Sequence, residues 1–386
     1  MGRQEGLKPL PRDRASESGG GRLLVNGRFL YARPTGVQRV SMALLHQIGA
    51  RRHELEDMFP GGIQVEAPPG DAASSIAGVA VHKAGRVRGQ LWEQVSLPRQ
   101  ARRRGSGRDD LILSLSNVGP LAAVRGITMI HDAQVYTAPQ SYSKAFVRWY
   151  RFLLPRLGRR NVQVLTVSHF SKQQLVSYGV APEARITVIP NGCDHVLGFA
   201  SDMATVDRLK LAAGRYVVAL ATTQPHKNIA VLLRAFADGA MGDVKLVLLG
   251  KASAAEMKAA YPFMPDDVLF TGAISDAELR GLLEQALCFA MPSTTEGFGL
   301  PPLEAMILGT PAIVAPCGAL PEACGEGALY AAPDRPEAWQ AQMRTLRDDP
   351  ELRETMKARG EIQARNFTWA RAGDVLIETL RRCSRQ

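Results

Sequence analysis

Residues 293–306 read STTEGFGLPPLEAM, and this stretch predicts a loop and a helix that follow a strand. The strand is the apolar run at 287–291, which is typical of a buried parallel strand. Pro301 and Pro302 favour a helix start, because the first turn of a helix leaves its N–H groups unpaired and proline has none. Gly309 is typical of the position just after a helix. The stretch therefore predicts an α/β unit with a glycine-rich loop at the carboxyl end of a strand.

The loop in this stretch is suited to binding an anion or a polyol. Unpaired amides and the positive end of the helix dipole converge where the helix begins. The residues that supply these amides are Gly297, Phe298, Gly299 and Leu300. Glu296 lies in the loop, Glu304 lies about one turn into the helix, and carboxylates accept strong hydrogen bonds from sugar hydroxyls. An ordinary capping acid is the alternative interpretation, and two acids around a glycine-aromatic-glycine loop favour the binding site.

The same residues resemble the signature of retaining glycosyltransferases of family 4, in which seven residues separate two glutamates, as Glu296 and Glu304 are separated here. The resemblance extends over roughly residues 22–382. It implies an α/β protein with the GT-B fold, in which two Rossmann-like domains face each other across a cleft and the last helix crosses back to the first domain. It also implies that the loop binds a nucleotide-sugar donor.

Length and composition fit two globular domains. The chain has 386 residues, of which 46% are hydrophobic and 22% charged. The polar, glycine-rich residues 1–21 lack the apolar segment of a signal peptide, so we expect a disordered leader. From the resemblance we expect an acceptor-binding domain at 22–195, a donor-binding domain at 196–368, and a C-terminal helix at 369–386 that packs on the first domain.

Short apolar runs mark the predicted strands. These lie at residues 23–25, 110–115, 126–130, 162–167, 186–189, 216–221, 244–249, 268–271, 287–291 and 310–315, with 310–315 as the last strand. A helix with Val40, Leu44 and Ile48 on one face should follow the first strand. Ser275 and Glu278 have the spacing of a capping box.

The net charge of +10 is unevenly distributed. Residues 1–195 hold 27 Lys and Arg against 14 Asp and Glu, whereas residues 196–386 hold 20 against 23. This asymmetry indicates an anionic partner for the first half, such as an anionic membrane surface, a lipid pyrophosphate or nucleic acid. The basic segments are an arginine-dense run at 86–108 and an aromatic, amphipathic helix at 146–157. Two alternative explanations remain. The basic segments can be ordinary solvent-exposed helix faces, and the excess of arginine can reflect a GC-rich genome.

Metal and disulfide chemistry have no signature in the sequence. The five cysteines form neither a CxxC nor a zinc-binding pattern, so we expect reduced thiols in a cytoplasmic protein. No Asp-x-Asp triplet occurs, which favours a metal-independent mechanism without a cofactor. We expect a cytoplasmic location, with peripheral attachment to the inner face of the cytoplasmic membrane as an extension of that expectation.

Four further site residues lie in segments that resemble motifs of the family and follow one another in the same order along the chain. Gly36 lies in a glycine loop after the first strand, where the resemblance places the donor diphosphate. His131 follows the strand at 126–130, at the edge where α/β sheets bind ligands. A lone histidine there is more often structural, but the resemblance implies a position near the donor sugar. Thr223 and Lys227 follow the first strand of the second half, and a lysine just before a helix suits a phosphate.

The resemblance assigns roles to these residues. His131 and Glu296 are the expected catalytic residues and should fix the sugar, whereas Glu304 should accept from the ribose hydroxyls and Lys227 should neutralise the diphosphate. The family has an arginine where this chain has Ala221, which leaves the second phosphate cation unassigned. The candidates that could replace it are His226, Arg39 or another basic residue.

The expected reaction moves a hexose, with mannose favoured, from a GDP- or UDP-hexose to a saccharide acceptor. The acceptor is expected to be linked to a polyprenyl lipid, in the synthesis of a cell-surface polysaccharide. Trp92-Glu93-Gln94, followed by Leu97-Pro98, is similar to bacterial family 4 enzymes of that kind, in which the first domain receives the acceptor.

Two alternatives remain at this point. The first is another GT-B activity, such as a nucleotide-sugar epimerase or a phosphorylase. The second is a non-catalytic nucleic-acid binder that uses the run at 86–108 and loses affinity steeply with salt. It leaves Glu296, Glu304 and Lys227 without a function, so we do not expect nucleic acid as a partner.

Overall fold

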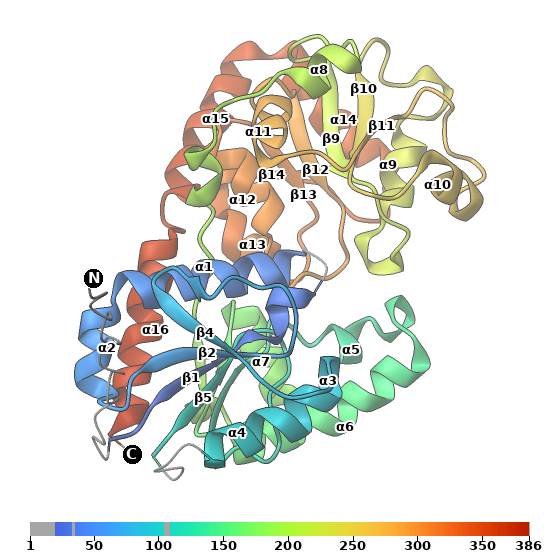
Figure 1. The fold of residues 1–386 in the computed structure, drawn as a ribbon. Coiled ribbons are helices and arrows are strands. Elements are labelled where there is room, and N and C mark those ends of the chain that lie inside the picture. The colour runs from blue at the N-terminus through green and yellow to red at the C-terminus, as the bar shows by residue number, and fades with distance from the viewer. Residues whose placement is uncertain (1–19, 33–34, 104–108, 386) are drawn as a thin grey trace, which may run out of the picture.

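The computed structural model describes residues 20–32, 35–103 and 109–385, and it contains two α/β domains that face each other, one above the other in Figure 1. The leader expected at residues 1–21 lies, apart from its last two residues, outside this part of the chain. The end of the arginine-dense run, residues 104–108, also lies outside it. No helix of the described residues is both long enough and apolar enough to cross a membrane.

The first domain is built on a sheet of eight strands in the order β3-β4-β2-β1-β5-β6-β7-β8. All neighbouring pairs are parallel except β3 with β4. The strands are β1 (Leu23–Asn26), β2 (Ile63–Ala67), β3 (Ser75–Ile76), β4 (Val79–Lys83), β5 (Leu111–Ser114), β6 (Arg125–Met129), β7 (Gln163–Thr166) and β8 (Ile186–Val188). Strands β1 and β5 are buried along their whole length, because helices cover both faces of the sheet.

Helix α1 lies above this sheet in Figure 1, and α4 and α6 lie below it. The first-domain helices are α1 (Gly36–Ala50), α2 (Arg52–Met58), α3 (Gly89–Leu91), α4 (Leu97–Arg103), α5 (Gln134–Thr137), α6 (Lys144–Arg160) and α7 (His169–Ser177). Helix α1 buries Val40, Leu44 and Ile48, which confirms the predicted apolar face. The aromatic, basic helix predicted at 146–157 is part of α6.

The second domain has six parallel strands in the order β11-β10-β9-β12-β13-β14. They are β9 (Tyr216–Leu220), β10 (Lys245–Leu249), β11 (Leu269–Gly272), β12 (Cys288–Met291), β13 (Ala312–Val314) and β14 (Ala328–Tyr330). The prediction that the strand at 310–315 is the last one is wrong. Strand β14, three residues long, follows β13 in the chain and pairs with it at the edge of the sheet.

The helices of the second domain connect these strands. They are α8 (Ala204–Arg208), α9 (Ile229–Ala235), α10 (Ala254–Ala260), α11 (Asp276–Glu284), α12 (Leu300–Ile307), α13 (Leu320–Cys324), α14 (Pro336–Asp348) and α15 (Pro350–Ala364). The capping box predicted at the start of α11 is confirmed, because Ser275 Oγ accepts from the Glu278 amide and Glu278 accepts from the Ser275 amide.

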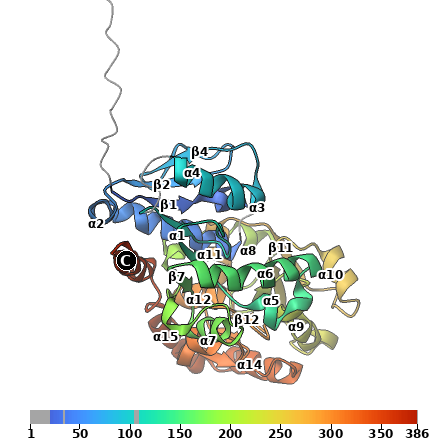
Figure 2. The same ribbon diagram turned by 90° about the horizontal axis from the view of Figure 1, so that it is seen from below.

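The last helix, α16 (Trp369–Ser384), returns to the first domain and packs against α1 and α2 (Figures 1 and 2). It buries Leu376 and Leu380, and its Asp374 pairs with Arg51 at the end of α1. The GT-B prediction that the C-terminal helix crosses back is therefore confirmed.

The chain passes between the two domains at two segments that contact each other. The Cys193 amide donates to the Phe367 carbonyl at 2.9 Å, and the Trp369 amide donates to Asp194 Oδ1 at 2.9 Å. The segment that enters the second domain is thereby hydrogen-bonded to the segment that leaves it.

Candidate active site

A cavity of about 780 Å³ lies between the two domains. Its walls come from the segments after β1, β5 and β6 in the first sheet and after β9 and β12 in the second, where the order of strands reverses. Ligands of α/β sheets bind at the carboxyl ends of strands beside such a reversal. Eight of the ten predicted site residues line the cavity: Gly36, His131, Lys227, Glu296, Gly297, Phe298, Gly299 and Leu300.

The loop after β12 is held directly against the first domain. The carbonyl oxygen of Gly297 accepts hydrogen bonds from Ser168 Oγ at 2.7 Å and from Ser171 Oγ at 3.0 Å. A Cβ atom at position 297 would lie 2.8 Å from Asp132 Cβ, so only glycine fits this contact. Gly299 caps the start of α12 with φ +117°, a conformation that favours glycine. The two glycines thus bring the amides before α12 to the cavity.

Lys227 and Glu296 form an ion pair on the second-domain wall. Lys227 Nζ lies 2.7 Å from Glu296 Oε1 and 3.0 Å from Oε2, and the two side chains are 20% and 8% exposed. The neighbouring Asn228 has φ +53° and fixes the turn by donating from Nδ2 to the carbonyls of Pro292 and Pro333. A ligand phosphate that binds this lysine would share it with the carboxylate.

His131 is a buried, neutral side chain on the first-domain wall. Its Nε2 lies 2.9 Å from the Leu115 carbonyl and must donate to it, which leaves Nδ1 without a proton. Its amide donates to Asn117 Oδ1 at 2.8 Å. Burial lowers the pKa of the imidazole to about 4, so the ring is uncharged at neutral pH. Such a ring can accept a hydrogen bond from a sugar hydroxyl, but it does not supply a positive charge.

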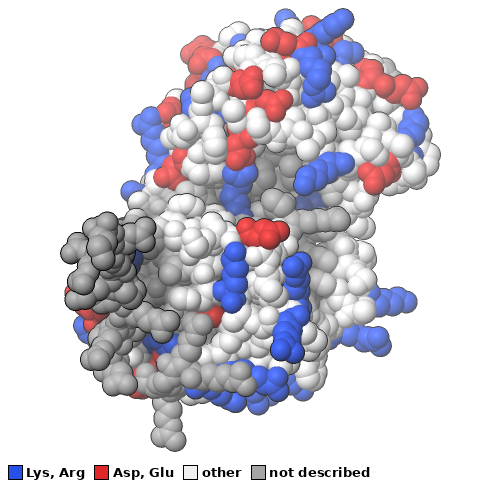
Figure 3. Space-filling view, viewed as in Figure 1, with Lys and Arg blue, Asp and Glu red and all other residues white. Residues whose placement is uncertain are grey.

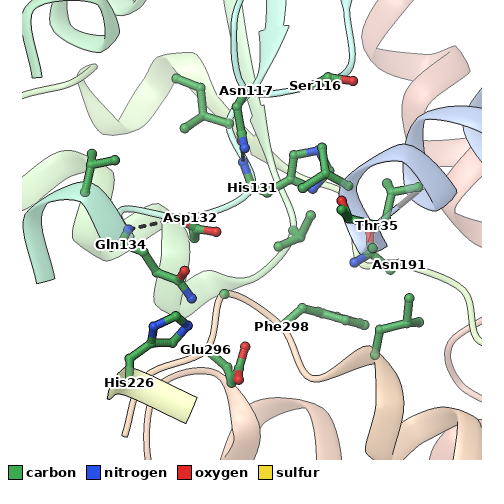
Figure 4. Close-up of a pocket in the computed structure, with 18 of the residues that line it drawn as sticks. Thr35, Ser116, Asn117, His131, Asp132, Gln134, Asn191, His226, Glu296 and Phe298 are labelled. Carbon is green, nitrogen blue, oxygen red and sulfur yellow. Dashed lines mark hydrogen bonds between the residues drawn. The ribbon is translucent and has the colours of Figure 1, made fainter. Parts of the chain in front are cut away.

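Asp132 also lines the cavity, although the sequence analysis does not assign it a role. In Figure 4 it lies between His131 and Gln134, above His226 and Glu296. Its Oδ1 accepts from the Gln134 amide at 2.9 Å at the start of α5. Burial raises the pKa of this carboxyl group. The position directly after His131 at a strand end was the signal that could have indicated it.

His226 connects the second domain to the first at the edge of the cavity. Its Nδ1 lies 2.7 Å from Ser141 Oγ, and its ring stacks on Tyr142 with 6.5 Å between the ring centroids. Burial and the nearby Lys227 lower the pKa of the His226 imidazole. This candidate for the cation missing at Ala221 therefore contacts the first domain.

Arg39, the other named candidate, lies on α1 and also spans the two domains. Its Nη2 lies 2.7 Å from Asp276 Oδ1 at the start of α11. The two domains are thus linked by polar contacts through Arg39, His226 and Gly297.

Glu304 and Thr223 do not belong to the cavity lining. Glu304 is buried on α12, and its Oε1 lies 3.0 Å from His195 Nε2. His195 Nδ1 accepts from Trp369 Nε1 at 3.2 Å, so Nε2 carries the ring proton, but the contact of Nε2 with Glu304 does not have hydrogen-bond geometry. The sequence analysis missed His195, and its place in the segment that enters the second domain gave no local signal. Glu304 is therefore held from the side of the interdomain connection.

Two family models match this chain. The model described as Glycosyltransferase Family 4 matches residues 34–197, and the model described as Glycosyl transferases group 1 matches residues 208–363. The chain belongs to glycosyltransferase family 4. Both matched segments contribute walls to the cavity, so the cavity is the candidate active site of a glycosyltransferase.

Two relatives of this glycosyltransferase are O-antigen mannosyltransferases. The O-antigen chain mannosyltransferase B of Escherichia coli is 28% identical, with 87% of this chain and 93% of that protein covered. The O-antigen chain mannosyltransferase RfbU of Salmonella typhimurium strain LT2 is 29% identical over 64% of this chain and 67% of that protein.

The fold of the glycosyltransferase is that of GT-B enzymes. The crystal structure of Anabaena HepE in complex with UDP and glucose superimposes with a TM-score of 0.70 at 19% identity, and the match covers 94% of this chain and 99% of that one. In the described part of the transferase, no three His, Cys, Asp or Glu side chains are grouped so as to hold a metal ion.

Proposed function

We propose that this glycosyltransferase moves mannose from a nucleotide-diphosphate mannose, with GDP or UDP as the nucleotide, to a saccharide acceptor, and that it retains the anomeric configuration. The observation that carries the proposal is the cavity between the two strand-order reversals, with the glycine loop, Lys227 and Glu296 on one wall and His131 on the other. Mannose as the transferred sugar is supported by the names of the two O-antigen relatives.

In the proposed complex, the donor diphosphate lies between the two domains. Lys227 and the amides of residues 297–300 would neutralise it from the second domain, and the start of α1 at Gly36 would approach it from the first. Preorganised donors of this kind usually supply the largest part of transition-state stabilisation. Glu304, whose Oε1 lies beside His195, would accept hydrogen bonds from the ribose hydroxyls.

The proposed chemical step is a substitution on one face of the sugar. The acceptor hydroxyl bonds to C1 as the bond from C1 to the diphosphate oxygen breaks, and the hydroxyl proton passes to the departing diphosphate. The neutral His131 and the carboxylate of Glu296 would hold the sugar hydroxyls during this step. The contacts between the domains would exclude water, which would otherwise hydrolyse the donor. No cofactor or metal takes part in the proposed step.

We further propose that the acceptor is lipid-linked and that the enzyme works at the inner face of the cytoplasmic membrane. Helix α6 supports this proposal, because it carries an exposed Phe152 among arginines. The arginines are Arg148, Arg151, Arg156, Arg159 and Arg160. On the face shown in Figure 3, the first domain presents mainly basic side chains, and acidic ones are more frequent on the second domain.

The test is a transfer assay with GDP-mannose and UDP-hexoses, with and without a mannose-terminated acceptor, and with and without excess EDTA. The proposal predicts acceptor-dependent transfer from one donor, unchanged by EDTA, with an α linkage from an α donor by NMR. Conversion of the nucleotide-sugar without any acceptor would indicate an epimerase instead. Turnover that needs free phosphate would indicate a phosphorylase.

A further inference from the structure

Arg28 lies in the first-domain wall of the cavity, in the 3-10 turn Gly27–Tyr31 that follows β1. Its Nε donates to Glu93 Oε1 at 3.0 Å, and its side chain is 22% exposed. Among the described residues, its two terminal nitrogens have no acceptor within hydrogen-bond distance. The guanidinium group is therefore fixed at one corner and has donors available to a ligand.

Glu93 holds Arg28 from a π-helical turn, Trp92–Ser96, and turns of this kind recur at functional sites. The side chain of Glu93 is fully buried, and its Oε1 also accepts from Asn26 Nδ2 at 2.6 Å. Its Oε2 has no partner among the described residues. A buried carboxylate stabilises a fold less well than apolar packing does. The contacts of Glu93 therefore indicate that it positions Arg28.

The neighbouring residues of the Trp-Glu-Gln motif build the support of this turn. Trp92 is fully buried, and its Nε1 donates to the Ala84 carbonyl at 2.7 Å. Gln94 Nε2 donates to the Gly119 carbonyl at 2.8 Å, and Gln94 Oε1 accepts from the Leu121 amide at 3.0 Å. The motif thus ties the turn to the loop after β5 and fixes the direction of Glu93.

Polar groups of α5 and α6 surround the same part of the cavity. Tyr142 OH donates to Gln134 Oε1 at 2.5 Å, which leaves the Gln134 amide nitrogen to a ligand. Tyr150 stacks on Phe146 with 4.0 Å between ring centroids. Burial raises the pKa of its phenol, and the nearby Arg28 opposes that rise. This wall of the first domain therefore offers amide, phenol, carboxylate and guanidinium groups to the cavity, and its Asp132 lies against Gly297 of the glycine loop.

We infer that Arg28, positioned by Glu93, binds an uncharged sugar residue of the acceptor, with Asp132, Gln134 and Tyr150 as further hydrogen-bonding partners. The inference rests on the proposed function and names the substrate group that this wall recognises. Arg28 is held by Glu93 at Nε, so its terminal nitrogens can donate to sugar hydroxyls in fixed directions. The two acceptors in the experiment below separate this role from binding of a diphosphate.

The experiment compares Arg28→Lys and Arg28→Gln with the wild type in steady-state transfer to two acceptors. One acceptor is a mannose-terminated trisaccharide with a neutral aglycone, and the other is the same glycan on a short polyprenyl diphosphate. We expect the acceptor KM to rise by about tenfold or more for both acceptors, the loss expected for hydrogen bonds from a charged group. The donor KM and the thermal shift produced by the donor nucleotide should stay unchanged.

Arg22 provides the matched control. It pairs with the buried Asp110 at the opposite end of β1, with Nε 3.1 Å from Oδ1, and it does not line the cavity. Arg22→Gln should lower the unfolding temperature but leave the acceptor KM unchanged. Glu93→Gln keeps an oxygen for Arg28 Nε, so it should raise the acceptor KM less than Arg28→Gln does, with kcat unchanged.

Three other outcomes would contradict the inference, and each of them has a different meaning. A loss confined to the diphosphate-linked acceptor would assign Arg28 to phosphate binding. An unchanged acceptor KM in both Arg28 variants would overturn the acceptor subsite while leaving the proposed function intact. A wild type that transfers sugar from no donor to either acceptor would overturn the proposed function, and the inference with it.

Discussion

Lys227 Nζ lies 2.7 Å from Glu296 Oε1, so the cation that follows β9 and the carboxylate that follows β12 meet beside the reversal of strand order. Neither side chain is free in this structure, and both are mostly buried. Each member of the pair is the ionic partner of the other, and both line the cavity. Removing one member leaves the other buried without a partner, which is strongly destabilising for a pair in the protein interior.

Lys227→Ala should lower kcat/KM for transfer by about 100-fold or more, the usual effect of removing one preorganised donor from a developing anion. It should also lower the unfolding temperature, because Glu296 loses its partner. Initial rates and thermal unfolding measure the two effects. Lys172→Ala is the matched control, since Lys172 pairs with the exposed Glu183 away from the cavity. Equal rates for both variants would exclude Lys227 from the donor site.

Glu304→Gln should weaken donor binding through the ribose. We expect the wild type to bind the ribonucleoside diphosphate about tenfold more tightly than its 2′,3′-dideoxy analogue, because each lost hydrogen bond to a charged group costs about 1.5–3 kcal/mol. In Glu304→Gln this preference should shrink. Titration calorimetry with both nucleotides checks it. A preference of the same size in both proteins would mean that Glu304, held by His195, serves the structure alone.

Gly36→Ala tests whether the donor diphosphate lies against residue 36, because the substitution should change donor binding without weakening the fold. Among the described residues, nothing lies within 4 Å of a Cβ atom at position 36, which is also the first residue of α1. The unfolding temperature should therefore stay the same or rise slightly, since alanine favours a helix over glycine. The donor KM should rise, because the added methyl group would meet the diphosphate. An unchanged donor KM would place the diphosphate elsewhere.

The pKa of His131, lowered to about 4 by burial, makes the stability depend on pH. Between pH 6.5 and about 4 the unfolded histidine binds a proton that the folded one does not, so stability rises with pH in this window and is complete above it. Urea midpoints at pH 5 and pH 7.5 measure this change. His226, whose pKa is also lowered, adds to it.

His131→Asn provides the comparison for this pH effect. The variant should lose a large part of the wild type's stability gain between pH 5 and pH 7.5, since asparagine does not titrate. The same gain in variant and wild type would show that the imidazole of His131 is not kept neutral by burial.

The parts of the fold that could be predicted are those that depend on residues close together in the sequence. The loop and helix at 293–306 follow from an apolar run, two prolines and glycines, and the capping box of Ser275 and Glu278 needs only residues three apart. The cavity residues after β12 could be predicted for the same reason. The edge strand β14 was missed, although it is as long as β13, which was predicted.

The contacts that the sequence analysis missed join distant parts of the chain. His195 meets Glu304, and Glu93 meets Arg28, through side chains that are brought together only when the sheets are assembled. No spacing rule connects such positions in one sequence. Asp132 was missed for another reason, since a carboxylate after a strand can equally serve the local backbone, and here Asp132 accepts from the Gln134 amide while lining the cavity.

The most direct test of the donor site is the unfolding temperature of the wild type and of Lys227→Ala with GDP, UDP and ADP, each with and without EDTA. A ligand at about 100 times its dissociation constant adds about 2.7 kcal/mol of stability, or a few degrees for domains of this size. We predict a rise with GDP or UDP that EDTA does not change and that is strongly reduced in Lys227→Ala. No rise with any of the three nucleotides would contradict a nucleotide-sugar site in this cavity.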